Sequence, residues 1–403
     1  LEFRRVLFRS VIEKATHRQT RLQNEQLVLK TVYHGQEISR AQIARLTHLT
    51  RPTVSDLVAD LMAQGLVIEV GHGPSTGGKP PMLLSVDEDA RHIVGVDLSR
   101  WDFRGAIIDL HGHIDHREHR PLRERNGQGA LKLVYELLDG LLNRTDRPIL
   151  GIGVGTPGLI DAVDGVIVQA VNLAWRDVPL CALLEARYGV PVYLANDCQA
   201  AAVGEYTFGN SEGVQDLVVI SVEWGIGAGI VINGDLLHGN PLGAGEIGHV
   251  KVAENGVRCS CGNIGCLETV AKGESIARRT QELLSTKTTA TLPQASPPLD
   301  FPAVCKMARQ SHPAAEQAIQ EAAEGLGIVA ANLVAILGSC HIRLTGELNC
   351  LGEPFLDLIK KEMTHRTLTT LAKSSKCEFA TLGSDIVLLG AAAMILTQEL
   401  GVY

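Results

Sequence analysis

The chain has 403 residues, enough for two or three domains, and 45% of them are hydrophobic, which allows large buried cores. No run approaches the roughly 18 apolar residues of a membrane span, and we expect no secretion signal at the N-terminus. Nine cysteines, an odd number, argue against a disulfide framework and favour a reducing cytoplasm. The net charge is −8, yet residues 1–85 carry more basic than acidic side chains, which points to a polyanionic partner for this part.

The first ten residues, LEFRRVLFRS, do not begin with Met and fit no element that follows. We therefore treat residues 1–10 as a non-native scar and leave them out of the fold. A first domain is predicted over residues 11–87, where helical and turn patterns give way to a strand-rich pattern near residue 88.

Residues 22–64 predict three helices. Residues 22–33 have apolar side chains at helical spacing. Ser39 is the expected N-cap of a short second helix, with Ala41, Ile43, Ala44 and Leu46 turned partly inward. After the turn THLT, Pro52 fits the first turn of a third helix and Gly65 fits its C-terminal end. The third helix is expected to bury a stripe made of Val54, Leu57, Val58 and Leu61.

The start of the third helix exposes side chains suited to DNA. Arg51, Thr53 and Ser55 can meet phosphates and base edges in a major groove. The segments LVIEV and PMLLSV are expected to pair as a hairpin, with Lys79 at a Gly- and Pro-rich tip that suits a minor groove. The alternative is a small helical domain used for protein contacts. The stretch SRAQIARLTHLTRPTVSDLVADLMAQGLV…STGGKPP resembles the winged helix-turn-helix of bacterial repressors.

From residue 88 onward the pattern is α/β. Strands are predicted at HIVGVDLS, FRGAIIDLHGHI, PILGIGVGT, VPVYLAND, the two halves of DLVVISVEWGIGAGIVING, and CHIRLTGEL. Helices are predicted at LKLVYELLDGLL, CQAAAVGEY and IVLLGAAAMILTQEL. Residues 285–298 are rich in Ser, Thr and Pro and are expected to form a surface loop.

Three cysteines lie within eight residues, Cys259, Cys261 and Cys266, ten positions after His249. Thiolates and imidazole are the ligands that a tetrahedral zinc ion prefers, and Gly262 and Gly265 permit the sharp turns that bring the sulfurs together. Four protein ligands would make this a closed, structural site. Reduced cysteines in a small loop beside a surface histidine remain the alternative.

The motifs GTPG, LAND, GIGAGIVING, GAGEIGHV and CSCGNIGCLE resemble those of the ROK family (repressors, open reading frames and kinases). The resemblance implies a two-lobed body of the actin-like, sugar-kinase-like ATPase superfold. Its first lobe is expected at 88–205, completed by a C-terminal helix at 384–403. The second is expected at 206–383, with the metal loop, a sugar cleft and an oligomerisation surface.

The family resemblance also implies one structural zinc ion on His249, Cys259, Cys261 and Cys266. It implies a sugar-binding set of six residues: Asn172, Asn196, Asp197, Glu246, His249 and Glu268. The alternatives from the residues alone are that Asn172 caps a turn and that Asp197 caps the helix CQAAAVGEY. Since Glu246 and Glu268 flank the metal loop, we expect the metal to shape one wall of the sugar pocket.

A sugar kinase is the rival interpretation, because ROK kinases use an Asp at the position of Asp197 as general base. Phosphoryl transfer also needs close contact between backbone N–H groups and nucleotide phosphates. Here Asp97 is followed by Ser99, Arg100 and Trp101 where the family favours small residues, and Glu223 and Trp224 precede Gly225 in the second loop. We therefore expect no catalytic residue, and Asp197 as a vestigial base.

Together these features predict a sugar-responsive transcriptional regulator, of repressor type. We expect its partners to be double-stranded operator DNA, a small sugar effector and a second copy of the chain, because such readers pair on half-sites related by two-fold symmetry.

Overall fold

The computed structural model describes residues 17–74, 80–99, 101–239, 243–287 and 298–402. The predictions for residues 1–10, Lys79 and Arg100 lie outside the described residues, as does most of the loop expected at 285–298. Contacts divide the chain into two compact units, residues 1–90 with 396–403, and residues 91–395. Each unit is described separately below.

The first unit is a winged helix. Its helices are α1 (His17–Gly35), α2 (Arg40–Thr47) and α3 (Arg51–Ala63). Three strands, β1 (Ile38–Ser39), β2 (Val67–His72) and β3 (Met82–Val86), form a sheet of order β1-β3-β2. The predicted hairpin is confirmed, because β2 and β3 pair antiparallel. The three helices pack on one another, α1 and α2 also contact β3, and α3 contacts β2, as in a helix-turn-helix with a wing.

The ends of α2 and α3 follow from their capping residues. The Ser39 side chain accepts a hydrogen bond from the backbone N–H of Gln42. In return, the Gln42 side-chain oxygen accepts a hydrogen bond from the backbone N–H of Ser39. Thr50 caps α3, Pro52 lies in its first turn, and Gly65 follows its end with φ +75°. The predicted stripe of four apolar residues on α3 is buried.

The inward face predicted for α2 was wrong at two positions. Ala41 and Leu46 are exposed, Leu46 at 66%, whereas Ile43, Ala44 and Thr47 are buried. The helix has only eight residues, so its buried face is narrow, and Thr47 can occupy it because its hydroxyl donates to the Ile43 carbonyl at 2.7 Å.

The second unit contains two five-stranded sheets of the same topology. The first has order β11-β7-β4-β5-β6 and the second has order β14-β13-β12-β15-β16. In each sheet, three consecutive strands form an antiparallel meander. A fourth strand pairs in parallel with the first strand of the meander, and a fifth pairs in parallel with the fourth. The bounds of the first sheet are β4 (His92–Leu98), β5 (Asp102–Ile108), β6 (Ile114–Pro121), β7 (Ile149–Thr156) and β11 (Val192–Asn196).

The second sheet consists of β12 (Leu217–Val222), β13 (Ile226–Ile232), β14 (Asp235–Leu236), β15 (His341–Gly346) and β16 (Lys376–Phe379). A small third sheet of order β10-β9-β8 is formed by β8 (Leu159–Asp161), β9 (Val166–Ala170) and β10 (Trp175–Val178). This repeated α/β arrangement is the two-lobed body predicted from the sequence.

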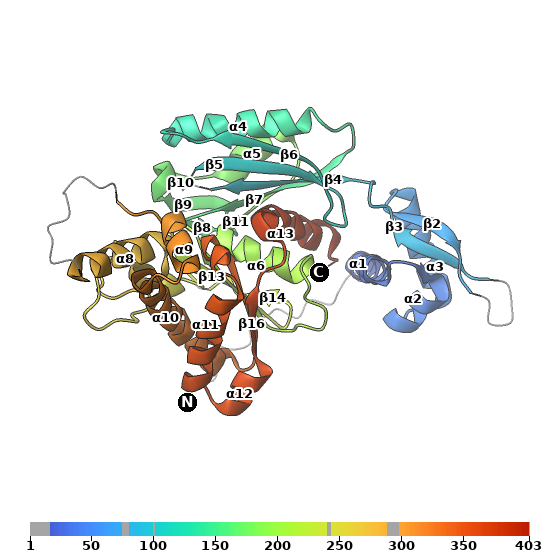
Figure 1. The fold of residues 1–403 in the computed structure, drawn as a ribbon. Coiled ribbons are helices and arrows are strands. Elements are labelled where there is room, and N and C mark those ends of the chain that lie inside the picture. The colour runs from blue at the N-terminus through green and yellow to red at the C-terminus, as the bar shows by residue number, and fades with distance from the viewer. Residues whose placement is uncertain (1–16, 75–79, 100, 240–242, 288–297, 403) are drawn as a thin grey trace, which may run out of the picture. The chain divides into compact units, whose positions relative to one another are not determined.

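Helices α6 (Asp197–Thr207) and α13 (Ile386–Ile395) pack on each other between the two large sheets (Figure 1). α13 contacts β4 and β7 of the first sheet, and α6 contacts β12 and β13 of the second. The packing is close: a Cβ on Gly390 would lie 1.8 Å from the Ala200 carbonyl oxygen, so only glycine fits. The two helices therefore join the lobes.

The remaining helices cover the outer faces. α4 (Gly127–Leu142) packs on β5 and β6, and α5 (Leu180–Tyr188) packs on β9 and β11. The others belong to the second lobe: α7 (Glu268–Ala271), α8 (Gly273–Lys287), α9 (Phe301–Arg309), α10 (Pro313–Leu337), α11 (Glu353–Arg366) and α12 (Thr369–Ser374). Because α8 runs to Lys287, residues 285–287 are helical and not part of a loop as predicted.

Two helical stretches, Pro313–Leu337 and Gly383–Leu400, are long and apolar enough to cross a membrane by composition. Most of each is buried inside the protein. α10 contributes many side chains to the largest hydrophobic core, and α13 lies between the sheets. Their apolar character is thus accounted for by core packing.

The C-terminal helical segment is divided between the two units, with the boundary between Ile395 and Leu396. We assigned residues 384–403 to the first lobe, and α13 does pack on the first sheet. Residues 396–403, including the π-helical turn η5 (Leu396–Leu400), group instead with the first unit. The physical reason is their packing on α1, where the His34 ring Nε2 lies 2.8 Å from the Val402 carbonyl oxygen.

Candidate functional site

The predicted metal ligands converge on one point. The ligand atoms of His249, Cys259, Cys261 and Cys266 all lie within 4.8 Å of one another. The Sγ atoms of Cys261 and Cys266 are 3.6 Å apart, and Cys259 Sγ is 3.6 Å from His249 Nδ1. Tetrahedral coordination with Zn–S of about 2.3 Å and Zn–N of about 2.0 Å places such atoms about 3.5–3.8 Å apart. The donor set and its spacing therefore fit a closed zinc site.

The loop that carries the sulfurs is shaped by backbone hydrogen bonds and glycines. The Cys259 N–H donates to the Asn263 carbonyl at 2.7 Å, and the Gly262 N–H donates to the Cys259 carbonyl at 3.0 Å. Gly265 has φ +77°, and a Cβ there would lie 1.8 Å from the Ala253 carbonyl oxygen. Any side chain at Gly265 would displace the loop.

The two carboxylates flanking the loop take different positions. The His249 ring faces Cys259 with Nδ1, while its Nε2 lies 3.9 Å from a Glu246 carboxylate oxygen. Glu268, at the start of α7, accepts a hydrogen bond from the Ile226 N–H at 2.9 Å, and a Cβ on Gly225 would clash with its carboxylate. A metal ion on Nδ1 would leave His249 Nε2 available for a ligand oxygen.

Asn196 and Asp197 lie where β11 ends and α6 begins. The Asn196 side chain caps α6 by accepting from the Cys198 N–H at 2.9 Å, and its amide donates to the Gly158 carbonyl at 3.2 Å. The N-cap of α6, the alternative role considered for Asp197, is therefore Asn196. Asp197 Oδ1 also lies 2.9 Å from the Cys198 nitrogen. Burial raises the pKa of Asp197, and the Glu246 carboxylate acts in the same direction.

Asn172 lies on a 3₁₀ turn, η1 (Val171–Leu173), that follows β9. Its amide nitrogen is buried and has no hydrogen-bond partner among the described residues. A buried, unpaired donor is costly, so this atom is a natural place for a ligand hydroxyl. Asn172 does not act as the cap of this turn, because the N-cap residue of η1 is Ala170 and no side chain makes a capping hydrogen bond there.

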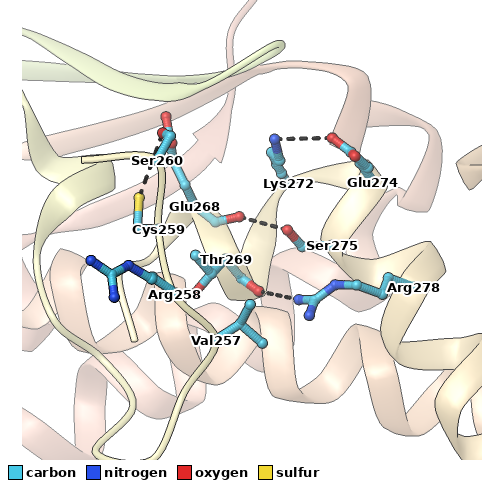
Figure 2. A pocket seen from close by; sticks show the side chains of 10 residues that line it. All are labelled: Val257, Arg258, Cys259, Ser260, Glu268, Thr269, Lys272, Glu274, Ser275 and Arg278. Atoms are coloured by element: carbon cyan, nitrogen blue, oxygen red, sulfur yellow. Dashed lines mark hydrogen bonds and ion pairs between the residues drawn. The ribbon is translucent and has the colours of Figure 1, made fainter. Parts of the chain in front are cut away.

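A pocket of about 180 Å³ lies against the metal loop (Figure 2). Its walls include Cys259, Glu268, Lys272 and Arg278. Arg278 donates to the Thr269 carbonyl at 2.9 Å, and Lys272 pairs with Glu274 at 3.0 Å. Glu268 is the only member of the predicted sugar-binding set among the residues that line it. The pocket is smaller than the roughly 300–1,000 Å³ of typical ligand sites.

The predicted nucleotide side of the body contains an ion pair that sequence reasoning missed. Asp97, at the end of β4, is 2% exposed and pairs with Arg104 of β5, which also donates to the Ser384 carbonyl at 2.9 Å. The signal was available, because antiparallel pairing of β4 and β5 sets Asp97 opposite Arg104. The Asp97 carboxylate is therefore already engaged by a guanidinium.

Two more carboxylates lie near this pair. Desolvation by surrounding atoms raises the pKa of Glu223 to about 7, and the nearby Glu347 and Asp97 carboxylates add to the effect, even though Glu223 as a whole is exposed. Burial also raises the pKa of Glu347, whose carboxylate accepts from the Gly273 N–H at 2.7 Å. This concentration of acidic groups disfavours an approaching phosphate.

The pair also predicts a pH dependence of stability. Burial raises the pKa of Asp97 to about 6, against the opposing effect of Arg104. In an unfolded chain Asp titrates near about 3.9. The contribution of Asp97 protonation to the free energy of unfolding is therefore fully present below about pH 4. It is lost as the pH rises through about 6. Melting temperature should fall less steeply between pH 5 and 7.5 in Asp97→Asn than in the parent chain. Asp164→Asn, on an exposed turn, should keep the parent slope; parallel slopes in all three would contradict the prediction.

The comparisons with known proteins agree with this geometry. A model of the ROK family matches residues 93–398, and a model of the MarR family matches residues 25–74. The chain is 32% identical over 387 residues to the xylose repressor of Caldicellulosiruptor bescii, covering 94% of this chain and 96% of that protein. It is 31% identical over 332 residues to the DNA-binding transcriptional dual regulator NagC of Escherichia coli, covering 81% and 80% of the two chains.

Solved structures share the fold. The crystal structure of a ROK family transcriptional regulator, a homologue of the E. coli Mlc protein, matches with a TM-score of 0.84 and 24% identity, covering 95% of this chain and 98% of the other. A ROK family glucokinase from Streptomyces griseus, in complex with glucose and AMPPNP, matches with a TM-score of 0.64 and 27% identity, covering 75% and 98%. The chain therefore belongs to the ROK family, with a MarR-like winged helix at its N-terminus.

Proposed function

We propose that this protein is a sugar-responsive transcriptional repressor that acts in the cytoplasm. The observation that carries the proposal is the union in one chain of a winged helix and a ROK body in which His249 and three cysteines lie close enough to hold a metal ion. Relatives that align over nearly the whole chain are named as repressors, which supports a regulator over a kinase.

The ligand in this proposal is a sugar or sugar derivative. Its hydroxyls would meet the six residues of the predicted set, Asn172, Asn196, Asp197, Glu246, His249 and Glu268. Carboxylates and amides accept and donate in the fixed pattern that a ring of hydroxyls requires. The Asn172 amide nitrogen, which has no hydrogen-bond partner among the described residues, supports this assignment. So does the His249 ring, because a metal ion on Nδ1 would leave Nε2, which lies 3.9 Å from the Glu246 carboxylate, facing away from the metal. The names of the relatives, which include a xylose repressor and an N-acetylglucosamine repressor, make xylose and N-acetylglucosamine the first sugars to test.

One zinc ion per chain is part of the proposal. Zinc would be held by His249, Cys259, Cys261 and Cys266 and would keep the loop folded. The role is structural, because the four protein ligands fill a tetrahedral shell and leave no position for a substrate. The matching distances between the ligand atoms support this assignment.

Operator contact would be made by the N-terminal end of α3. Arg51 and Ser55 are exposed there, and Thr53 is half-buried with its hydroxyl 2.8 Å from that of Thr50. Lys79, which lies outside the described residues, stays a proposed DNA contact on the basis of the sequence alone. The protein would bind as a homodimer, since a two-fold pair of heads matches paired half-sites. Sugar must bind one arrangement of the dimer better than the other in order to regulate it.

Arg51→Ala should weaken operator binding about tenfold or more and reduce the dependence of affinity on salt, because a phosphate or base contact is lost. The shift in melting temperature caused by sugar should be unchanged. Fluorescence anisotropy with labelled operator DNA at several salt concentrations, together with a thermal-shift assay, measures both. The charge-matched control is Lys132→Ala, at an exposed position on α4 of the body. Loss of the sugar response in Arg51→Ala would contradict the division of roles.

The second candidate is an ATP-dependent sugar kinase with a DNA-binding head. The solved glucokinase neighbour and the position of Asp197 favour it. The Asp97–Arg104 pair and the neighbouring acidic groups oppose it. ADP release with a panel of hexoses and pentoses decides between the two. Turnover near 1 s⁻¹, common for enzymes, would establish the kinase, whereas we expect none above background.

A further inference from the structure

Two cysteines outside the metal loop lie unusually close together. The Sγ atoms of Cys305 and Cys350 are 2.7 Å apart, although the residues are 45 positions apart in the chain. A covalent S–S bond measures about 2.05 Å. By comparison, the metal-site sulfurs of Cys261 and Cys266, which are arranged around a common centre, are 3.6 Å apart. The fold thus already places Cys305 and Cys350 side by side, in near-bonding contact.

The two thiols differ in access. Cys350 lies on the 3₁₀ turn η3 (Glu347–Leu351) and is exposed. Cys305 lies on the inner face of α9 and is 6% exposed. Burial raises the pKa of Cys305 to about 12, and its contact with Cys350 adds to the effect. A reagent from solution therefore meets Cys350 first, and Cys305 is protected until its neighbour has reacted.

We propose that Cys305 and Cys350 form a reversible intramolecular disulfide when the protein meets a peroxide. The Cys350 sulfur attacks one peroxide oxygen, so an S–O bond forms, the O–O bond breaks, and the other oxygen leaves as water with the thiol proton. The Cys305 sulfur then attacks the resulting sulfenic acid. An S–S bond forms, the S–O bond breaks, and a second water leaves with the Cys305 proton. Two thiols are oxidised, and one hydrogen peroxide is reduced to two waters.

The position of the pair gives the disulfide a structural consequence. It would join α9 to η3, and the same turn carries Glu347, which accepts from the Gly273 N–H at the start of α8. A bond between residues 45 positions apart restricts the unfolded chain considerably. The oxidised protein should therefore melt at a temperature higher by roughly 5 °C or more. This inference is independent of the sugar or DNA that the protein binds.

The test uses the full chain loaded with zinc. Hydrogen peroxide is added in small excess, remaining thiols are alkylated, and tryptic peptides are mapped by mass spectrometry without reduction. A peptide that links Cys305 to Cys350 should appear and should disappear after dithiothreitol. Cys350→Ser should abolish both this peptide and the rise in melting temperature. Cys377→Ser, which removes a buried thiol on β16 that has no part in the pair, should change neither.

Two results would overturn the proposal. One is full alkylation of Cys305 and Cys350 under conditions that already oxidise the metal-loop cysteines. The other is a disulfide from Cys350 to a second chain, visible as a dimer on a non-reducing gel. Because the peptide map is made on the parent chain, the test does not depend on the folding of any variant.

Discussion

Cys261→Ser is expected to release the zinc ion and to lower sugar affinity by at least tenfold. Cys261 is the exposed sulfur of the cluster, so its replacement removes a ligand without opening the core. A three-ligand site loses much of its affinity for the metal, and the loop that positions Glu246, His249 and Glu268 loses its anchor. Metal content by mass spectrometry and sugar affinity by calorimetry measure the two effects.

Ser260→Ala is the matched control for this experiment. Ser260 lies between two of the proposed ligands in the chain, and its hydroxyl is 3.9 Å from Cys259 Sγ. A neutral serine hydroxyl is not among the ligands that zinc prefers. This variant should keep one zinc per chain and the parent affinity. Should the sugar bind to Cys261→Ser as tightly as to the parent chain after the metal is gone, the loop does not depend on metal for its shape, and the proposed wall of the sugar site is incorrect.

Glu205→Ala is expected to destabilise the body by about 3–5 kcal/mol, because it leaves a buried guanidinium without its partner. Glu205 is fully buried on α6, and its carboxylate lies 2.5 Å from Nη1 of Arg343 on β15. It also accepts from the backbone N–H groups of Thr381 and Leu382 at 2.8 and 3.2 Å. One side chain thus joins a central helix, a strand and the segment after β16.

Thermal unfolding should show a drop of roughly 10 °C for Glu205→Ala. Asp139→Ala removes the partner of Arg187 in an exposed ion pair and should cost at most about 1 kcal/mol. The double variant Glu205→Leu/Arg343→Met should recover part of the loss, because no charge remains buried. An equal effect of Glu205→Ala and Asp139→Ala would show that the buried network contributes little.

Much of the architecture could be predicted from local patterns. The ends and apolar stripe of α3 depend on residues close together in the chain, so Pro52, Gly65 and the apolar spacing were sufficient signals. The N-cap Thr50 was predicted only as part of the turn THLT. The cluster that could hold a metal ion was also predictable, because metal sites require particular residue types and three of them lie within eight positions. The large strands were found because buried strands read as continuous apolar runs.

Other elements carried weaker signals. β6 has a half-buried pattern of charged residues and was not predicted as a strand. Leu46 was expected inside and is exposed, because an eight-residue helix buries only a narrow face. The end of the C-terminal helix was assigned to the body, whereas its last residues group with the N-terminal unit. In each case the outcome depends on which neighbour the element meets.

The sequence by itself determined the kind of domains, the family motifs and the residues able to hold a metal, because each depends on residue type and short-range spacing. Tertiary structure alone decided which distant groups meet: Glu205 with Arg343 across 138 positions, and Cys305 with Cys350 across 45. These pairs arise where separately folded elements pack, and no local pattern specifies the partner. The physical reason is that the chemical type of a side chain determines which groups it can interact with. The packing of the fold determines which of those groups lie next to it.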